Sequence, residues 1–265
     1  MSVIRIQQFD DPRLAVYRSV SDAELLQRRN RFVAEGRLVV GRLLEAGHRV
    51  ESMLLNEASF RALEPLISQL PAQVPVYICE TGQFAAITGF NLHRGCLALA
   101  ERPQPLEMPD VIQDAELILV LEAVTDADNV GSAFRNAAAF GARVILSETC
   151  CDPLYRKAIR TSMGAALGTP YARTNNWPDE LATLKTEGFT IIALTLRADA
   201  IELASHARGH ARQKFAIVVG SEGPGLSAAA ESFADICVRI PISADVDSLN
   251  LATATGIALF YFTNH

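Results

Sequence analysis

The sequence of 265 residues has no apolar run close to the roughly 18 residues that a membrane-spanning helix needs. Residues 1–8 also lack the apolar core of a secretory signal, so nothing there marks the chain for export. We therefore expect a cytoplasmic protein that does not bind a membrane. The length is too great for one average domain and suits two, and 49% hydrophobic residues are enough for packed cores.

Cysteine is scarce, and its spacing does not suit a metal site. The five cysteines (Cys79, Cys96, Cys150, Cys151 and Cys237) include no C-x-x-C pair. The adjacent Cys150 and Cys151 are typical of buried small residues at a strand end. The five histidines match no motif either, so we expect no metal and assign no histidine as a general base.

An excess of positive charge is missing as well, because 30 Asp and Glu outweigh 24 Lys and Arg to give a net charge of −6. This argues against nucleic-acid binding through overall charge. The distribution is uneven, however, since residues 1–50 hold nine Arg against six acidic residues. Arginine suits bidentate phosphate contacts and stacking on bases, although a GC-rich genome would produce the same preference over lysine.

The first hundred residues alternate between helical and strand patterns. We predict helices at 22–30, 36–46, 57–70 and 83–88, and strands at 31–35, 50–55, 74–78 and 95–100. Three prolines within 103–109 favour an extended backbone. We therefore predict an N-terminal domain at 1–102, a linker at 103–114 and a second domain at 115–265.

The second domain opens with an apolar strand at 117–121, of the kind buried in a parallel sheet. Further strands are predicted at 143–146, 190–194, 215–219 and 236–240, and helices at 130–140, 153–166, 178–187, 226–232 and 248–261. This alternation predicts an α/β fold, a mostly parallel sheet with helices on both faces. Ligands bind such sheets at the carboxyl ends of the strands.

Three polar turns follow predicted strands at 126–135, 220–225 and 240–250. In the first, Asp128 or Asn129 can cap the next helix, and a solvated Arg135 is the simplest interpretation of the residues alone. In the second, Glu222 would repel a pyrophosphate, so a nucleotide without phosphate, such as S-adenosylmethionine, suits the loop better. In the third, Asp247 or Ser248 can cap the last helix.

Asn250 is an amide in an otherwise apolar helix, where it needs a hydrogen-bond partner. Adenine, an active-site neighbour or a cap network within the loop would each supply one. Arg156 and Arg160 are four residues apart on one face of a predicted helix, where a phosphate would relieve their repulsion. A solvated basic face is the alternative.

In order and content, the three turns resemble the three motifs of the SPOUT superfamily, in its SpoU–TrmH branch of RNA ribose 2′-O-methyltransferases. The first match comprises Asn129, Gly131, Arg135 and Phe140-Gly141, with Ala127 where proline is usual. The others are Gly220-x-Glu222-x-x-Gly225 and Ser248-Leu249-Asn250, the latter with Ala244 where glycine is usual. Arg31-x-x-x-Glu35-Gly36 and Val76-Tyr77 resemble the small ribosomal-protein-like RNA-binding domain found in many members.

This resemblance implies a trefoil-knotted α/β domain behind a small RNA-binding domain, S-adenosylmethionine as the cofactor, and a homodimer that completes the site. The implied reaction is methyl transfer to a ribose 2′-hydroxyl of RNA, with ribosomal RNA favoured over transfer RNA. A non-catalytic RNA-binding module of the same fold is the alternative. A nucleotide-dependent oxidoreductase is disfavoured, because its glycine fingerprint is missing after the first strand.

The resemblance also assigns residues. The implied catalytic residues are Asn129, Arg135, Glu222 and Asn250. The implied cofactor-binding residues are Leu194, Thr195, Gly220, Glu222, Gly225, Ile240, Ser248 and Leu249, and the RNA-binding residues are Arg31, Arg156, Arg160 and Ser162. In the family the residue matching Arg135 is described as the base, but a guanidinium stays protonated in proteins. Stabilising the developing oxyanion is the less demanding role.

Overall fold

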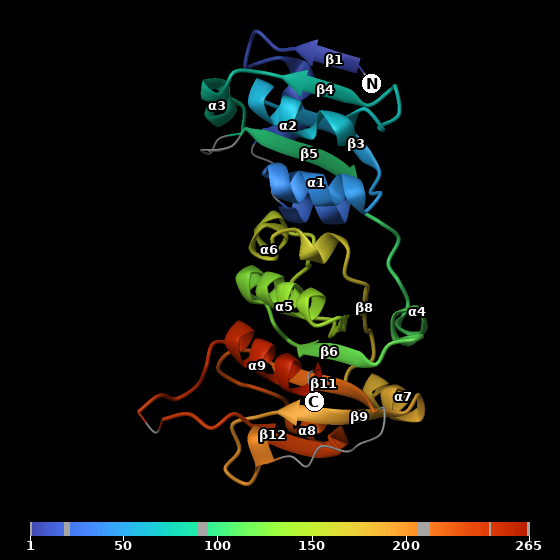
Figure 1. The fold of residues 1–265 in the computed structure, drawn as a ribbon, viewed down its shortest axis with the longest axis vertical. Coiled ribbons are helices and arrows are strands. Elements are labelled where there is room, and N and C mark those ends of the chain that lie inside the picture. Colours follow the sequence, from blue (N-terminus) through green and yellow to red (C-terminus); the bar gives the residue numbers. More distant parts are fainter. Residues whose placement is uncertain (1, 19–21, 89–94, 206–212, 244, 264–265) are drawn as a thin grey trace. The chain divides into compact units, whose positions relative to one another are not determined.

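The computed structural model describes residues 2–18, 22–88, 95–205, 213–243 and 245–263. The chain forms two compact units, drawn in Figure 1. Unit 1 comprises Met1–Gln104 and Leu154–Gly168, and unit 2 comprises Pro105–Pro153 and Thr169–His265. Each is described by itself below.

Unit 1 is built on a five-stranded sheet with the order β1-β4-β3-β5-β2. Its strands are β1 (Ser2–Arg5), β2 (Arg31–Glu35), β3 (Val50–Leu55), β4 (Pro75–Ile78) and β5 (Cys96–Glu101). The first three in the sheet are parallel, whereas β5 runs antiparallel to both β3 and β2. All but β1 were predicted, since β1 is a short edge strand with only one partly buried residue.

Helices cover both faces of this sheet. The α-helices are α1 (Arg37–Glu45), α2 (Glu57–Ile67), α3 (Phe84–Thr88) and α6 (Arg156–Thr161). Helices of other types are η1 (Pro12–Tyr17), η2 (Glu24–Arg28), η3 (Thr81–Gln83) and η4 (Ala165–Leu167). Asn56 begins α2 by accepting a hydrogen bond from the Ser59 N–H, and Leu63 and Ile67 bury one face of that helix. The predicted helix at 22–30 contains a π-helix, η2.

The segment Leu154–Gly168 belongs to the core of unit 1, although it follows the predicted linker by 40 residues. Its apolar side chains Leu154, Ile159 and Leu167 are buried in the cluster that α1 and α2 form with the sheet. The predicted helix at 153–166 is also shorter, because Met163 and Gly164 adopt positive φ angles that end α6.

Unit 2 contains a seven-stranded parallel sheet with the order β10-β12-β9-β11-β6-β7-β8. Its strands are β6 (Leu117–Glu122), β7 (Arg143–Leu146), β8 (Tyr171–Arg173), β9 (Phe189–Leu194), β10 (Ile201–Glu202), β11 (Lys214–Gly220) and β12 (Ile236–Arg239). All six residues of β6 are buried, as its continuous apolar sequence predicted. The edge strands β8 and β10 were not predicted.

Helices lie on both faces of the sheet (Figure 1). They are α4 (Met108–Ile112), α5 (Ala127–Ala139), α7 (Glu180–Thr186), α8 (Ala228–Phe233) and α9 (Leu251–Thr263). Buried residues of α4, α7 and α8 share one apolar cluster with Ile118 and Val120 of β6, and α5 packs against α9. Helix α4 corrects the interpretation of 103–114 as linker alone: Pro109 lies in its first turn, where a missing N–H costs nothing. No helix in the described part of the chain is long and apolar enough to cross a membrane.

Candidate functional site

Four neighbouring parallel strands, β12, β9, β11 and β6, end at the same edge of the sheet in unit 2. The loops that follow β9, β11 and β12 line a cavity of about 660 Å³. All eight predicted cofactor-binding residues lie in its wall: Leu194, Thr195, Gly220, Glu222, Gly225, Ile240, Ser248 and Leu249. The structure therefore gathers residues from two of the motifs around one concave surface.

The loop after β11 is a tight turn that only glycine permits. Ser221 and Gly225 form a bridge in which the Gly225 N–H donates to the Ser221 carbonyl at 3.1 Å. Gly223 and Gly225 have φ angles of +90° and +71°. A β carbon at Gly220 would lie 2.2 Å from the carbonyl carbon of Gly225. The glycines thus allow the loop to fold back and present Glu222.

The side chain of Asn250 brings the three motifs together. Its Nδ2 donates to Asn129 Oδ1 at 3.2 Å and to Glu222 Oε1 at 3.1 Å. Its Oδ1 accepts from the backbone N–H groups of Ala252 and Thr253, which caps α9. The Asn250 amide therefore contacts the other two motifs through its nitrogen and caps α9 through its oxygen. Asn250, and not the predicted Asp247 or Ser248, caps α9.

Helix α5 carries the other two predicted catalytic residues. Asp126, and not Asp128 or Asn129, caps α5 by accepting from the N–H groups of both residues. Asn129 is 8% exposed in the first turn, with its Oδ1 directed to Asn250. Arg135 is exposed, and among the described residues its guanidinium forms no hydrogen bond or ion pair. Asn129, Glu222 and Asn250 are thus in contact, whereas Arg135 does not join their hydrogen bonds.

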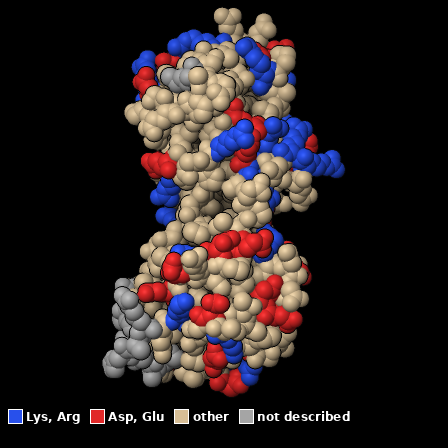
Figure 2. Space-filling model, turned by 90° about the vertical axis from the view of Figure 1, so that its right-hand side faces the viewer, with Lys and Arg blue, Asp and Glu red and all other residues tan. Residues whose placement is uncertain are grey.

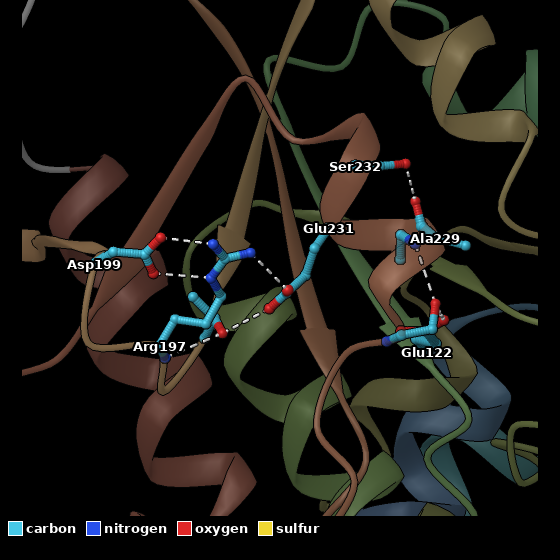
Figure 3. Close-up of polar contacts among 9 residues, drawn as sticks. Glu122, Arg197, Asp199, Ala229, Glu231 and Ser232 are labelled. Carbon is cyan, nitrogen blue, oxygen red and sulfur yellow. Dashed lines mark hydrogen bonds and ion pairs between the residues drawn. The ribbon is translucent and has the colours of Figure 1, made fainter.

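A second polar cluster in the cavity wall was not predicted. Arg197 forms two hydrogen bonds to Asp199 and one of 3.2 Å to Glu231, and Thr195 Oγ1 donates to Glu231 at 2.7 Å (Figure 3). These carboxylates, Asp199 first, raise the pKa of the Arg197 guanidinium. Arg197 could have been chosen as a candidate because it follows β9 closely. Its pairing with Glu231, 34 residues away on α8, depends on the tertiary structure.

The predicted RNA-binding residues all belong to unit 1. Arg31 of β2 pairs with Glu51 of β3 at 2.7 Å, across the intervening strand β5. Arg156 begins α6 and its backbone N–H donates to Asp22, while Arg160 is exposed near the end of the same helix. Ser162 is fully buried; its hydroxyl donates to the Ile159 carbonyl and accepts from the Ala166 N–H. The structure therefore does not bring Ser162 to a surface.

The two units differ in charge. Unit 1 holds 15 Lys and Arg against 11 Asp and Glu, a net charge of +4, and unit 2 holds 9 against 19, a net charge of −10. On the face drawn in Figure 2, most basic side chains belong to unit 1 and most acidic ones to unit 2. A polyanion is therefore attracted to unit 1 and repelled by the average field of unit 2.

No group of three His, Cys, Asp or Glu side chains close enough to hold a metal ion occurs among the described residues. The five cysteines are free, and Cys79, Cys96 and Cys150 are buried. Burial raises the pKa of the Cys151 thiol to about 11 and those of Cys79 and Cys96 to about 12. These three thiols are protonated at neutral pH and are therefore weak nucleophiles.

Comparison with known proteins identifies the family. The model of the SpoU rRNA methylase family matches residues 116–260. An uncharacterized tRNA/rRNA methyltransferase of Mycobacterium bovis is 39% identical over 95% of this chain and 88% of its own. The 23S rRNA (guanosine-2′-O-)-methyltransferase RlmB of Salmonella typhi is 30% identical over 79% of this chain and 88% of its own. The chain belongs to the SpoU methylase family, which confirms the resemblance seen in the sequence.

Solved structures share the fold along nearly the whole chain. The AdoMet-bound rRNA methyltransferase of Sinorhizobium meliloti superposes with a TM-score of 0.82 and 24% identity. The match covers 98% of this chain and 97% of that one. The α/β architecture described above is therefore that of the SpoU–TrmH methyltransferases.

Proposed function

We propose that the protein transfers a methyl group from S-adenosylmethionine to a ribose 2′-hydroxyl of RNA, with ribosomal RNA preferred over transfer RNA. The observation that carries this proposal is the contact of Asn250 with both Asn129 and Glu222 beside the cavity. Family membership, the guanosine 2′-O specificity in the name of RlmB and the AdoMet-bound structural neighbour support it.

The cavity fits S-adenosylmethionine in size and chemistry. Its volume of about 660 Å³ lies within the usual range for small-ligand sites. Leu194, Ile240 and Leu249 supply apolar surface for an adenine ring, and the loop that carries Glu222 places a carboxylate in the wall. A positively charged sulfonium is favoured near that carboxylate, whereas a pyrophosphate is repelled. When bound, the cofactor supplies an electrophilic methyl group.

The residues of the chain then orient and stabilise the reacting RNA. Arg135 binds a phosphate next to the target ribose, where it also stabilises the oxyanion that develops as the 2′ proton passes to water. Asn129 and Asn250 hold their amides in a fixed hydrogen-bonded pair at the cavity, so the alignment is set before the substrate arrives. The hydrogen bond from Asn250 also orients the carboxylate of Glu222 toward this amide pair.

Unit 1 supplies the RNA-binding surface in this proposal. Its net charge of +4 and the exposed Arg160 suit phosphate contacts, whereas the net charge of −10 on unit 2 opposes them. We assign RNA binding to the domain at 1–102, assisted by Arg31, Arg156 and Arg160, and catalysis to 115–265, with a trefoil-knotted chain path. Because Ser162 is buried, we assign it no contact with RNA.

A homodimer is part of the proposal. Helix α9 is apolar nearly all round, and its residues Thr253, Ile257 and Phe260 form an exposed stripe at helical spacing. A helix that is hydrophobic on every side is normally buried. A second copy of the chain would cover this stripe and complete the site. We place the enzyme in the cytoplasm, where its RNA substrates are transcribed.

The proposal is tested with labelled S-adenosylmethionine and total RNA from a strain that lacks the gene. We expect label in one RNA species, carried on a 2′-O-methylribose. Arg135→Ala should lose nearly all methyl transfer and keep cofactor affinity, because the side chain acts on RNA and not on the cofactor. Activity within tenfold of the wild type would refute the role of Arg135. Binding of RNA and cofactor without transfer would instead establish the non-catalytic binding module.

A further inference from the structure

Glu122 is a buried carboxylate with no place in the mechanism above. It is the last residue of β6, at the carboxyl end of a central strand, and is 6% exposed. Its Oε1 accepts hydrogen bonds from Trp177 Nε1 and from the Ser227 hydroxyl, both at 2.6 Å. Its Oε2 accepts from the Ser227 N–H at 2.8 Å. All three donors are neutral groups.

A buried carboxylate is expensive for a fold to retain. Removing a carboxylate from water is unfavourable, and neutral hydrogen bonds offset this cost only in part. An apolar residue would fill the end of an otherwise apolar strand, Leu117–Leu121, at lower cost. The three short contacts therefore indicate that Glu122 is needed for what it holds in place and not for stability alone.

What Glu122 holds is the end of the cofactor loop. Ser227 comes two residues after Gly225, the last residue of the tight turn that lines the cavity. The Ser227 hydroxyl donates to Glu122 and also accepts from the Ala230 N–H. The second hydrogen bond caps the N-terminus of α8. Figure 3 shows Glu122 beside the start of α8, while Glu231 of the same helix reaches toward Arg197. The loop is thus held at both ends, by β11 on one side and by Glu122 through Ser227 on the other.

We propose that Glu122 is a positioning residue for cofactor binding, acting through Ser227 to fix the loop 220–226. The inference rests on the proposed function, because it assigns S-adenosylmethionine to this cavity. Trp177 lies in a different loop and does not line the cavity. Trp177 donates to the same carboxylate as Ser227 but is not connected to the cofactor loop. A change at Trp177 therefore separates a general effect on Glu122 from an effect on the loop.

The test is a mutant cycle read by calorimetry with S-adenosylmethionine. Glu122→Gln keeps the shape but turns an amide N–H₂ toward the donors, and Ser227→Ala removes the hydroxyl. We expect each single variant to bind the cofactor about tenfold more weakly than the wild type. The double variant should also lose only about tenfold, because both changes break the same connection between Glu122 and Ser227. Trp177→Phe should stay within twofold. The rate at saturating cofactor should change less than threefold in all variants.

Lys185→Ala is the matched control, since it breaks an ion pair with Asp235 in the same unit and Lys185 does not line the cavity. Unchanged affinity in Ser227→Ala would overturn the proposal even if Glu122→Gln failed to fold. Equal losses for Trp177→Phe, or a hundredfold additive loss in the double variant, would show a general structural anchor instead. A wild-type protein that does not bind S-adenosylmethionine would refute the proposed function itself, a distinguishable outcome.

Discussion

Gly220 and Asn250 show how closely the candidate site depends on single atoms. A β carbon on Gly220 would collide with the backbone of Gly225, a contact that no rotamer change relieves. The amide of Asn250 uses both of its ends, the oxygen on the α9 backbone and the nitrogen on Asn129 and Glu222. A substitution at either residue therefore changes the position of a whole loop or helix end.

For Gly220→Ala we expect cofactor affinity to fall at least tenfold, because the loop cannot fold back onto the end of β11. Calorimetric titration with S-adenosylmethionine measures this loss. Gly82→Ala is the control, since nothing lies within 4 Å of a β carbon there. If Gly220→Ala bound the cofactor like the wild type, the loop would have to adopt another shape in solution.

At the scale of elements, α9 has one side that packs inside unit 2 and an opposite side that exposes apolar residues. Its buried side, which includes Leu251, Thr255, Ala258 and Leu259, faces the interior of unit 2. Gly256 allows α5 to approach closely, since a β carbon there would lie 3.3 Å from Asn136. On the opposite side, Ile257 and Phe260 are 38% and 52% exposed, although the Phe260 ring meets Phe140 edge to face.

We expect Ile257→Asp to convert a dimer into a monomer, because a charge at the centre of an apolar interface loses its hydration without gaining a partner. Sedimentation equilibrium measures the change, and methyl transfer should fall more than tenfold if the site is completed across the interface. Phe9→Asp changes an apolar residue of unit 1 that is more exposed than Ile257, at 56% against 38%, and should leave the assembly unchanged. A wild-type monomer would contradict the proposed dimer directly.

At the scale of the whole molecule, charge separates the two tasks. The chain carries −6 overall, yet unit 1 alone is positive. In the proposed function, the negative charge of unit 2 repels RNA that makes no contact with unit 1. This favours a substrate that the basic surface of unit 1 holds. RNA affinity should therefore depend on salt through the arginines of unit 1.

Arg160→Ala should weaken RNA binding severalfold and lower the dependence of log Kd on log salt by about one, as expected for loss of one phosphate contact. Cofactor affinity should not change. Arg239→Ala removes the same charge from unit 2, where the side chain pairs with Glu202, and serves as the control. Fluorescence anisotropy over a range of salt concentrations separates the two variants. Equal slopes for Arg160→Ala and the wild type would exclude Arg160 from the RNA surface.

The sequence by itself determined the local parts of this protein. The strands β3, β6 and β7 lie within a residue of their predicted bounds, because each is a short segment whose apolar residues the sheet buries. The turns after β6, β11 and β12 were identifiable because a strand, a polar turn and a helix are contiguous in the chain. The eight cofactor-binding residues came from the family resemblance, and all of them lie in the wall of the cavity. The family, too, was recognisable from motifs that are short and local.

Only the tertiary structure decided which distant segments meet. Asn129 and Asn250 are 121 residues apart, and Glu122 and Ser227 are 105 apart. Their contacts depend on the strand order β9-β11-β6, which local patterns do not encode. The placement of Leu154–Gly168 in unit 1 and the burial of Ser162 also depend on which distant segments pack together. An apolar or polar side chain shows that it needs a partner, but packing of the whole chain selects which partner it receives.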